Sequence, residues 1–183
     1  MMRIIAGEAG GRPLKAPPEG VRPTMDRVKG AIFSSLGDRI PGARVLDLFA
    51  GSGAMGIEAL SRGAASATFV EANPHCLGCI RENLRRAGVT GSVQGLDAFR
   101  FLDLYAGTNM FDLIFADPPY AKNPGDPDFA VLLTRSEKLV AALSPEGILV
   151  LERQAKRDHP ETLLTEGRTK RYGKTEVTFY FKP

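Results

Sequence analysis

The chain has few of the residues that most often bind metals or act in acid–base catalysis: two cysteines and two histidines among 183 residues. Cys76 and Cys79 have the C-x-x-C spacing of redox and zinc sites, but a structural zinc site takes four ligands. Both fall within one predicted helix, where residues three apart simply share a face. Neither His75 nor His159 has neighbours typical of a metal site or a Ser-His-Asp triad. We therefore expect no metal and no histidine-based catalysis.

Long apolar runs are also missing. No stretch approaches the roughly 20 residues of a membrane helix, and the first residues lack the apolar core of a signal peptide. The composition, 43% hydrophobic and 25% charged, is that of an ordinary globular protein. We expect a cytoplasmic monomer of one domain, with residues 1–43 as an N-terminal extension and residues 44–183 as the main sheet.

The net charge of +3 is unevenly distributed. Residues 1–44 contain eight Lys or Arg against four Asp or Glu, and residues 153–183 contain the same numbers. Residues 45–152 contain eight against thirteen. Two basic ends on one face would favour a polyanionic partner, although charge alone fits an ordinary solvated surface equally well.

The most informative stretch is V-L-D-L-F-A-G-S-G-A-M-G, residues 45–56. Its apolar start predicts a strand buried on both faces. Gly51 and Gly53 then allow a tight turn with uncovered backbone N–H groups. A helix is predicted from Ala54. A strand, a glycine turn and a helix N-terminus together form a cradle for a nucleotide-type cofactor, unless the turn binds nothing.

Two cofactors fit this cradle. The G-x-G-x-x-G pattern, with Glu71 about twenty residues further on, is typical of dinucleotide binding. Asp47 lies inside the strand, and its carboxylate suits the cationic amino end of S-adenosylmethionine better than a pyrophosphate. The choice between the two depends on a second motif.

Strands and helices alternate along the rest of the chain. The predicted strands are residues 45–49, 67–71, 92–96, 111–116 and 147–152, and the predicted helices are residues 54–60, 74–87, 98–105 and 129–143. Leu132, Leu133, Leu139, Val140 and Leu143 are the expected core of the last helix. This alternation favours an α/β fold with a doubly wound, mostly parallel sheet.

Both ends of the chain differ from this pattern. Residues 3–6 and 12–15 predict a small hairpin, and a helix with Thr24 as N-cap is expected to reach about Leu36. Residues 168–172 and 175–181 flank Gly173 and Lys174 and predict a terminal hairpin.

Carboxylates follow the predicted strands. Ligands of a doubly wound sheet bind at the carboxyl ends of its strands, and the residues near those ends are Asp47, Glu71, Asp97 and Asp117. We expect Glu71 to accept hydrogen bonds from both ribose hydroxyls of a nucleoside, and Asp97 to accept one from the adenine amino group.

The second motif is D-P-P-Y, residues 117–120. Its two prolines fix φ and remove two N–H donors. The Asp117 carboxylate and the Pro118 carbonyl can then both accept hydrogen bonds from one exocyclic amino group, which makes the nitrogen more nucleophilic. The ring of Tyr120 offers a face on which a base can stack. This motif favours amino-group methylation over hydride transfer.

The glycine loop and D-P-P-Y together resemble class I S-adenosylmethionine-dependent amino-methyltransferases. Four segments narrow the resemblance to the bacterial 16S ribosomal RNA guanine-N2 methyltransferase family: residues 22–27 (RPTMDR), 47–53 (DLFAGSG), 58–63 (EALSRG) and 172–175 (YGKT). The resemblance covers nearly the whole chain. It implies a Rossmann-like, mostly parallel seven-stranded sheet with an antiparallel last strand, preceded by a small hairpin. It also implies 16S ribosomal RNA, free or in an assembling small subunit, as the substrate.

Site residues follow from the motifs and the resemblance. The catalytic candidates are Asp117, Pro118 and Tyr120. The candidates for S-adenosylmethionine binding are Asp47, Phe49, Ala50, Gly51, Ser52, Gly53, Glu71, Ala72, Asp97, Ala98 and Asp117. Because Ala72 and Asn73 are small for packing on adenine, Phe99 is an alternative. The RNA-binding candidates are Arg3, Arg12, Lys15, Arg22, Thr24, Arg27 and Lys174, of which Arg22 and Thr24 equally suit closure over the cofactor.

Three other functions compete with this interpretation. An NAD-dependent oxidoreductase explains the glycines and Glu71 but not D-P-P-Y. A DNA or protein amino-methyltransferase shares the chemistry, but many carry Asn at the position of Asp117 or an added recognition domain. A non-catalytic RNA-binding scaffold explains the basic ends but not four carboxylates at strand ends.

Overall fold

The computed structural model describes residues 2–16, 26–105, 107, 110–121, 123, 125–155 and 161–183. The chain divides into two compact units, the first ending at Ala98 and the second beginning at Phe99. No helix among the described residues has the length and apolar character needed to cross a membrane.

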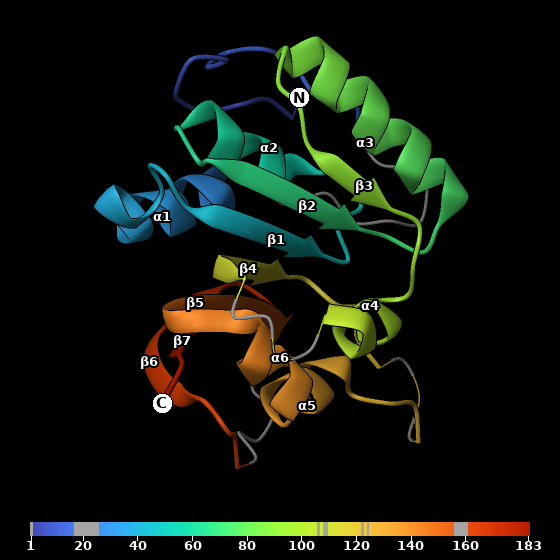
Figure 1. The fold of residues 1–183 in the computed structure, drawn as a ribbon, viewed down its shortest axis with the longest axis vertical. Helices are drawn as coiled ribbons and strands as arrows, with labels where there is room; N and C mark the ends of the chain where they lie inside the picture. Colours follow the sequence, from blue (N-terminus) through green and yellow to red (C-terminus); the bar gives the residue numbers. More distant parts are fainter. Residues whose placement is uncertain are drawn as a thin grey trace. The chain divides into compact units, whose positions relative to one another are not determined.

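Three parallel strands form the sheet of the first unit (Figure 1). They are β1 (Arg44–Leu48), β2 (Ser66–Val70) and β3 (Ser92–Gln94), in the order β3-β2-β1. The helices of this unit are α1 (Asp26–Leu36), the 3₁₀-helix η1 (Gly37–Arg39), α2 (Ala54–Ser61) and α3 (Pro74–Ala87). The helix predicted to reach about Leu36 is α1, and its Val28, Ile32, Phe33 and Leu36 are buried. The proposed N-cap, Thr24, lies outside the described residues.

Helix α3 begins and ends at the predicted residues, because capping residues mark both of its ends. The Asn73 side chain accepts a hydrogen bond from the His75 N–H, and Pro74 occupies the first turn. Gly88, at φ 67°, ends the helix in the left-handed conformation. Cys76 and Cys79 are both buried on this helix and are free thiols.

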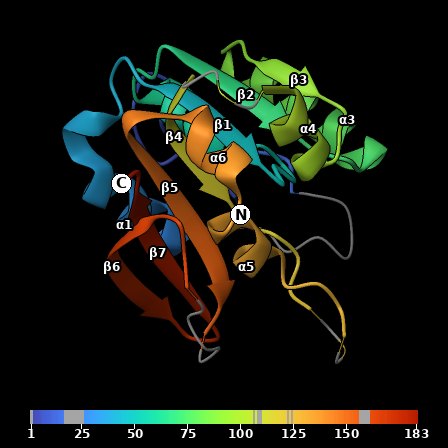
Figure 2. The ribbon, with the colours of Figure 1, turned by 60° about the horizontal axis from the view of Figure 1, so that its bottom comes forward.

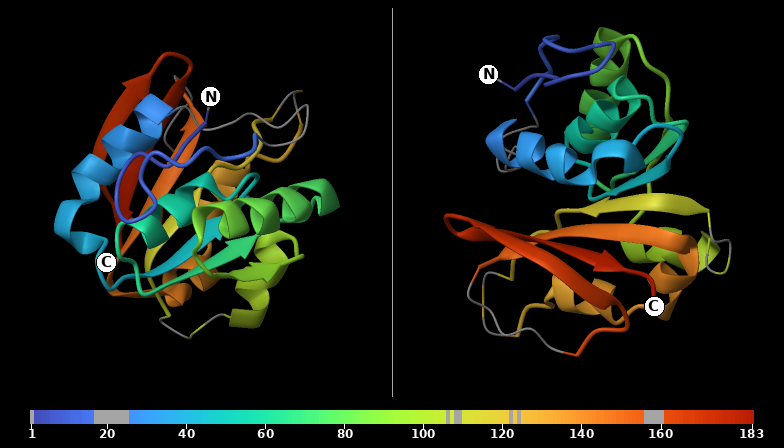
Figure 3. Two further views of the ribbon diagram at one scale, coloured as in Figure 1. Left: turned by 90° about the horizontal axis from the view of Figure 1, so that it is seen from above. Right: turned by 90° about the vertical axis from the view of Figure 1, so that its left-hand side faces the viewer.

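The predicted N-terminal hairpin forms only in part. The only bridge among residues 2–16 pairs Arg3 with Pro13, and neither arm forms a regular strand. Hydrogen bonds from the Ile4 N–H to the Arg12 carbonyl and from the Leu14 N–H to the Met2 carbonyl hold the arms together. This segment lies beside α2 and α3 (Figure 3).

Four strands form the sheet of the second unit, and Figure 2 labels them. They are β4 (Phe111–Ala116), β5 (Leu143–Gln154), β6 (Thr165–Tyr172) and β7 (Thr175–Phe181), in the order β4-β5-β7-β6. Strands β4 and β5 are parallel, and β7 pairs antiparallel with both β5 and β6. The helices are α4 (Ala98–Tyr105), α5 (Phe129–Thr134) and α6 (Glu137–Ala142).

The predicted fold class is confirmed: among the described residues there are seven strands, mostly parallel, with antiparallel strands at the end of the chain. The single helix predicted over residues 129–143 is wrong. It breaks at Arg135, because the Ser136 side chain accepts a hydrogen bond from the Leu139 N–H and begins α6. The break leaves Leu132 46% exposed rather than in the core, while Leu133 and Leu139 are fully buried.

Candidate active site

The glycine loop connects β1 to α2 through three residues with positive φ: Phe49 at 57°, Gly51 at 55° and Gly53 at 76°. Phe49 is the one non-glycine residue with positive φ in the described chain, a costly conformation that is typical of functional loops. Gly56 lies against Phe69 of β2, since a Cβ atom on Gly56 would fall 2.4 Å from the Phe69 ring. The third glycine of the motif therefore packs the helix onto the sheet.

Asp47 is buried in β1, with 3% of its surface exposed. Its Oδ2 accepts a hydrogen bond of 2.9 Å from the Gly56 N–H, in the first turn of α2. Burial, opposed by this hydrogen bond and supported by the nearby Glu71 charge, raises the pKa of Asp47 from 3.8 to about 7. A cation beside this carboxyl group would therefore be strongly favoured.

Glu71 follows β2 and is tied to the glycine loop. Its Oε2 accepts a hydrogen bond of 2.8 Å from the Gly51 N–H, and its Oε1 accepts one of 2.8 Å from the Asn73 N–H. Each carboxylate oxygen has a second lone pair, so ribose hydroxyls can still be accepted. The carboxylate thus fixes the loop as well as offering acceptors.

Three further cofactor candidates follow the ends of β2 and β3 in the sequence. Ala72 and Asp97 are exposed, and Ala98 is buried at the start of α4. In the second unit, Phe99 packs its ring 5.8 Å from that of Phe129. Phe99 therefore has a packing partner of its own, and its role beside adenine stays a prediction.

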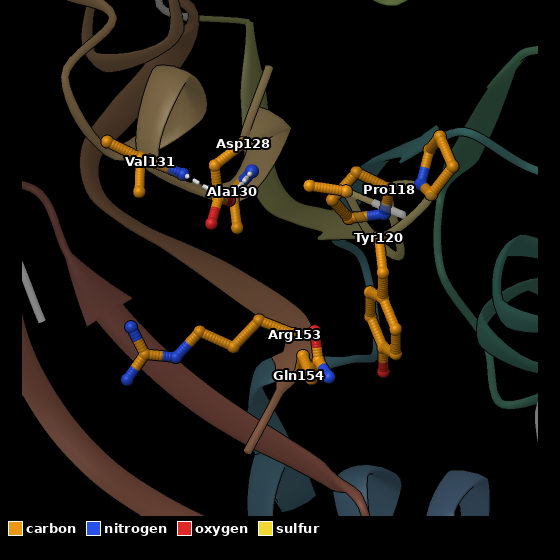
Figure 4. Close-up of a pocket in the computed structure, with 9 residues that line it drawn as sticks. Pro118, Tyr120, Asp128, Ala130, Val131, Arg153 and Gln154 are labelled. Atoms are coloured by element: carbon orange, nitrogen blue, oxygen red, sulfur yellow. Dashed lines mark hydrogen bonds between the residues drawn. The ribbon is translucent and has the colours of Figure 1, made fainter. Parts of the chain in front are cut away.

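D-P-P-Y follows β4 and borders a hollow in the second unit (Figure 4). Residues lining this hollow are Pro118, Pro119, Tyr120, Ala121, Asp128, Ala130, Val131, Arg153 and Gln154. The Tyr120 hydroxyl lies 3.0 Å from the Thr175 hydroxyl of β7, which fixes the orientation of the ring. A fixed aromatic ring at the rim of a hollow suits a stacked base.

Three polar lining residues were not among the sequence-based candidates. Asp128 caps α5 by accepting hydrogen bonds from the Ala130 and Val131 N–H groups (Figure 4). Arg153 and Gln154 lie at the carboxyl end of β5, and the Arg153 guanidinium pairs with Glu176 at 3.3 Å. Arg153 and Gln154 directly follow the strand end predicted at residue 152, as Asp117 follows the one at residue 116, so the same rule finds them once it is extended from carboxylates to other polar side chains.

The predicted RNA-binding residues differ in how freely they can meet a ligand. Arg3, Arg27 and Lys174 are exposed. The Arg12 guanidinium instead donates a hydrogen bond of 2.6 Å to the Ala87 carbonyl at the end of α3. Lys15 is exposed, while its backbone is bonded to Asn83. Arg22 and Thr24 lie outside the described residues.

A buried ionic cluster anchors the N-terminal segment. We call Lys29, Glu58, Ser61 and Arg62 the Glu58 cluster. Glu58 pairs with Lys29 at 3.0 Å, both side chains fully buried, and with Arg62 at 2.8 Å. Its carboxylate also accepts hydrogen bonds from the Ile5 and Ala6 N–H groups.

The Ser61 hydroxyl adds two further contacts to the N-terminal segment: it accepts a hydrogen bond from the Ala9 N–H and donates one to the Ala6 carbonyl. The E-A-L-S-R-G motif thus holds residues 5–9 against α2.

The fold is that of the Rossmann-like class I methyltransferases. A structure described as a hypothetical protein of Thermus thermophilus matches with a TM-score of 0.82 and 35% identity over 98% of each chain. A 16S rRNA N2 methyltransferase of Thermus thermophilus, solved with AdoMet and guanosine, shares the fold at 22% identity, with a TM-score of 0.72 over 90% of this chain and 44% of that one.

The chain belongs to the family described as Conserved hypothetical protein 95, whose model matches residues 2–181. A candidate rRNA methyltransferase of Bacillus subtilis, YlbH, is 38% identical over 99% of both chains. Ribosomal RNA small subunit methyltransferase D of Escherichia coli is 42% identical over 66% of this chain and 61% of its own length. The family resemblance drawn from the sequence is confirmed.

Proposed function

We propose that this protein is a methyltransferase of small-subunit ribosomal RNA that transfers a methyl group from S-adenosylmethionine to the N2 amino group of a guanine in 16S rRNA. The first unit binds the cofactor at the glycine loop, and the second holds the amino group at D-P-P-Y. The names of the family relatives support ribosomal RNA as the substrate class. The choice of guanine N2 is supported by D-P-P-Y and by the sequence resemblance.

The buried Asp47 carboxyl group is the observation that carries the choice of cofactor. A pyrophosphate binds at the N-terminus of the helix after the glycine loop, through free backbone N–H groups. Here the Gly56 N–H of that turn is already bonded to Asp47. A second anion there would face a buried carboxylate, whereas the ammonium group of S-adenosylmethionine would be attracted to it. NAD is therefore disfavoured.

In the proposed reaction the cofactor supplies an electrophilic methyl group on a sulfonium. The Asp117 carboxylate and the Pro118 carbonyl accept the two hydrogen bonds of the amino group and direct its lone pair at the methyl carbon. The bound cofactor would give its methyl group to this nitrogen, and the sulfur would keep the electron pair of the broken S–C bond. The nitrogen would release one proton to solvent and become a neutral secondary amine. Tyr120 stacks on the base, which must leave its own stack to reach the hollow.

The experiment that tests this function measures transfer of a labelled methyl group to 16S rRNA, offered both as free RNA and as small subunits lacking the modification. Nuclease digestion and mass spectrometry should place the label on N2 of a guanosine. Labelled DNA or protein with unlabelled rRNA would instead favour the related amino-methyltransferases. Calorimetry that detects NAD binding and no S-adenosylmethionine binding would contradict the cofactor assignment.

The role of Asp117 can be tested separately. Asp117→Ala should reduce turnover by about 10²–10³, by analogy with the loss of one preorganised group that stabilises charge in the transition state. Because Asp117 is also a candidate for cofactor binding, turnover is measured at saturating S-adenosylmethionine, and circular dichroism serves as the control for an intact fold. Near-normal turnover of the variant would remove Asp117 from the mechanism.

A further inference from the structure

A row of three side chains crosses the sheet of the second unit from the D-P-P-Y hollow to the edge strand. Gln154 of β5 pairs with Thr175 of β7, and Thr175 pairs with Tyr172 of β6. Directly opposed residues of antiparallel strands lie on the same face. Gln154 lines the hollow, and the Thr175 hydroxyl bonds to Tyr120. The row therefore connects the hollow with β6, which lies outside β7 (Figure 2).

Two exposed cations lie where this row ends. The Lys170 ammonium group lies 5.6 Å from the centroid of the Tyr172 ring, a cation–π contact. Lys174 is exposed in the two-residue turn between β6 and β7. Within the part of the chain that the structure describes, no carboxylate forms an ion pair with either lysine. Arg171 falls on the opposite face, beside Glu176, and its Nε donates to the Gly173 carbonyl.

Two basic residues of the first unit are engaged within the fold. Lys29 is fully buried against Glu58, and the Arg12 guanidinium donates to the end of α3. Their positive charge is used to hold the first unit together. By contrast, nothing in the described fold neutralises Lys170 or Lys174, and both are next to the row that leads to the hollow.

We propose that Lys170, Tyr172 and Lys174 form a subsite for the phosphodiester backbone of single-stranded RNA adjoining the base in the hollow. This subsite rests on the proposed function, because it assumes an RNA base at D-P-P-Y. Tyr172 acts as a positioning residue: its ring holds the Lys170 ammonium group in place, so less side-chain entropy is lost on phosphate binding. Residues two apart on a strand are spaced by about 6.6 Å, so Lys170 and Tyr172 extend the contact along the edge.

The test compares two double variants of equal charge. Lys170→Gln with Lys174→Gln removes the subsite, and Arg85→Gln with Arg86→Gln removes two exposed cations of α3 as the matched control. Binding of an oligouridylate is measured at several salt concentrations. Each lost phosphate contact should lower the slope of log affinity against log salt by about 0.7 on single strands. We expect the slope to fall by about 1.4 in the first variant and to stay unchanged in the control.

Single variants at Tyr172 test the positioning role. Tyr172→Phe keeps the ring and should bind the oligouridylate like the wild type, whereas Tyr172→Leu should bind several-fold more weakly. Circular dichroism and S-adenosylhomocysteine affinity verify that each variant is folded. Equal slopes in the two double variants, or no salt-dependent binding by the wild type, would overturn the subsite. Failure of the wild type to methylate 16S rRNA would instead overturn the proposed function, so the two failures are distinct.

Discussion

At the scale of single residues, the buried Asp47 carboxylate lowers the folding stability of the protein when no ligand is bound. Its pKa rises to about 7 in the fold, so between pH 4 and 7 the folded state binds more protons than the unfolded state. The stability that this group contributes therefore falls as the pH rises through that range. A carboxylate retained under these conditions is expected to have a cationic ligand.

The first prediction concerns Asp47→Asn. Asn cannot ionise, so the variant should be more stable than the wild type at pH 8 by a few kcal/mol, because each pKa unit corresponds to about 1.4 kcal/mol. At about pH 3, below the pKa of this carboxyl group in both the folded and the unfolded state, the two should unfold at similar temperatures. Calorimetry should also detect no S-adenosylmethionine binding by the variant at pH 8. A variant that is less stable at both pH values would show that the Gly56 contact requires the carboxyl group itself.

A second prediction at this scale concerns the pair formed by Tyr120 and Thr175. Tyr120→Ala should reduce kcat/KM for RNA much more than Tyr120→Phe, because a stacked base contributes about 1–3 kcal/mol. Tyr120→Phe and Thr175→Val should each lower the free energy of unfolding by about 1 kcal/mol, because each removes the shared hydrogen bond. The double variant should lose no more than either single variant. Additive losses would mean that the two hydroxyls act independently.

At the scale of secondary-structure elements, most of the fold could be predicted from local signals. Strand β4, strand β7 and helix α3 have the predicted bounds, because apolar runs, Pro74 and Gly88 mark their ends. The apolar periodicity continues through residues 129–143 and does not show the helix break, whereas the N-cap preference of Ser136 indicates it. The start of β5 at Leu143 could not be predicted, since Pro145 lies within it.

Local signals also predict where some of the candidate site residues lie, but not which residues they contact. Carboxylates at strand ends mark Asp47, Glu71 and Asp117, but their partners come from other parts of the chain. Glu71 meets Gly51 twenty residues away, and Tyr120 meets Thr175 across 55 residues. No local pattern specifies such contacts, because they depend on strand register.

The Glu58 cluster provides a prediction at the scale of elements. Glu58→Gln should destabilise the protein by about 3–5 kcal/mol, because Lys29 would be left as a buried, unpaired charge. Urea unfolding measures this loss. Glu82→Gln, which breaks exposed pairs with Arg85 and Arg86, is the control and should cost less than about 1 kcal/mol. Lys29→Met added to Glu58→Gln should restore part of the stability, and no restoration would argue against an unpaired lysine as the cause.

Acid should weaken the same cluster. Burial tends to raise the pKa of Glu58, but the Ile5 hydrogen bond, the Lys29 charge and the Arg62 contact together lower it below 4.5. The stability it contributes is therefore fully present above pH 4.5 and is lost as the pH falls through the lowered pKa.

At the scale of the whole molecule, the two units are assigned different ligands. Hydrogen exchange on the intact protein can separate them. S-adenosylhomocysteine should slow exchange at residues 47–56 and around Glu71, and oligouridylate should slow it at residues 168–175. A ligand that protects both regions equally would show that binding is not divided between the units in this way.

The anchoring of residues 5–9 on α2 has a consequence for the order in which the chain folds during synthesis. Residues 5–9 leave the ribosome before their partners Glu58 and Ser61, which emerge only after about fifty more residues have been added. Until then the apolar side chains of Ile4 and Leu14 have no core to enter, and closing so long a loop must precede any gain from the contacts. Residues 5–9 of the nascent chain therefore stay open to proteases and chaperones until α2 has formed.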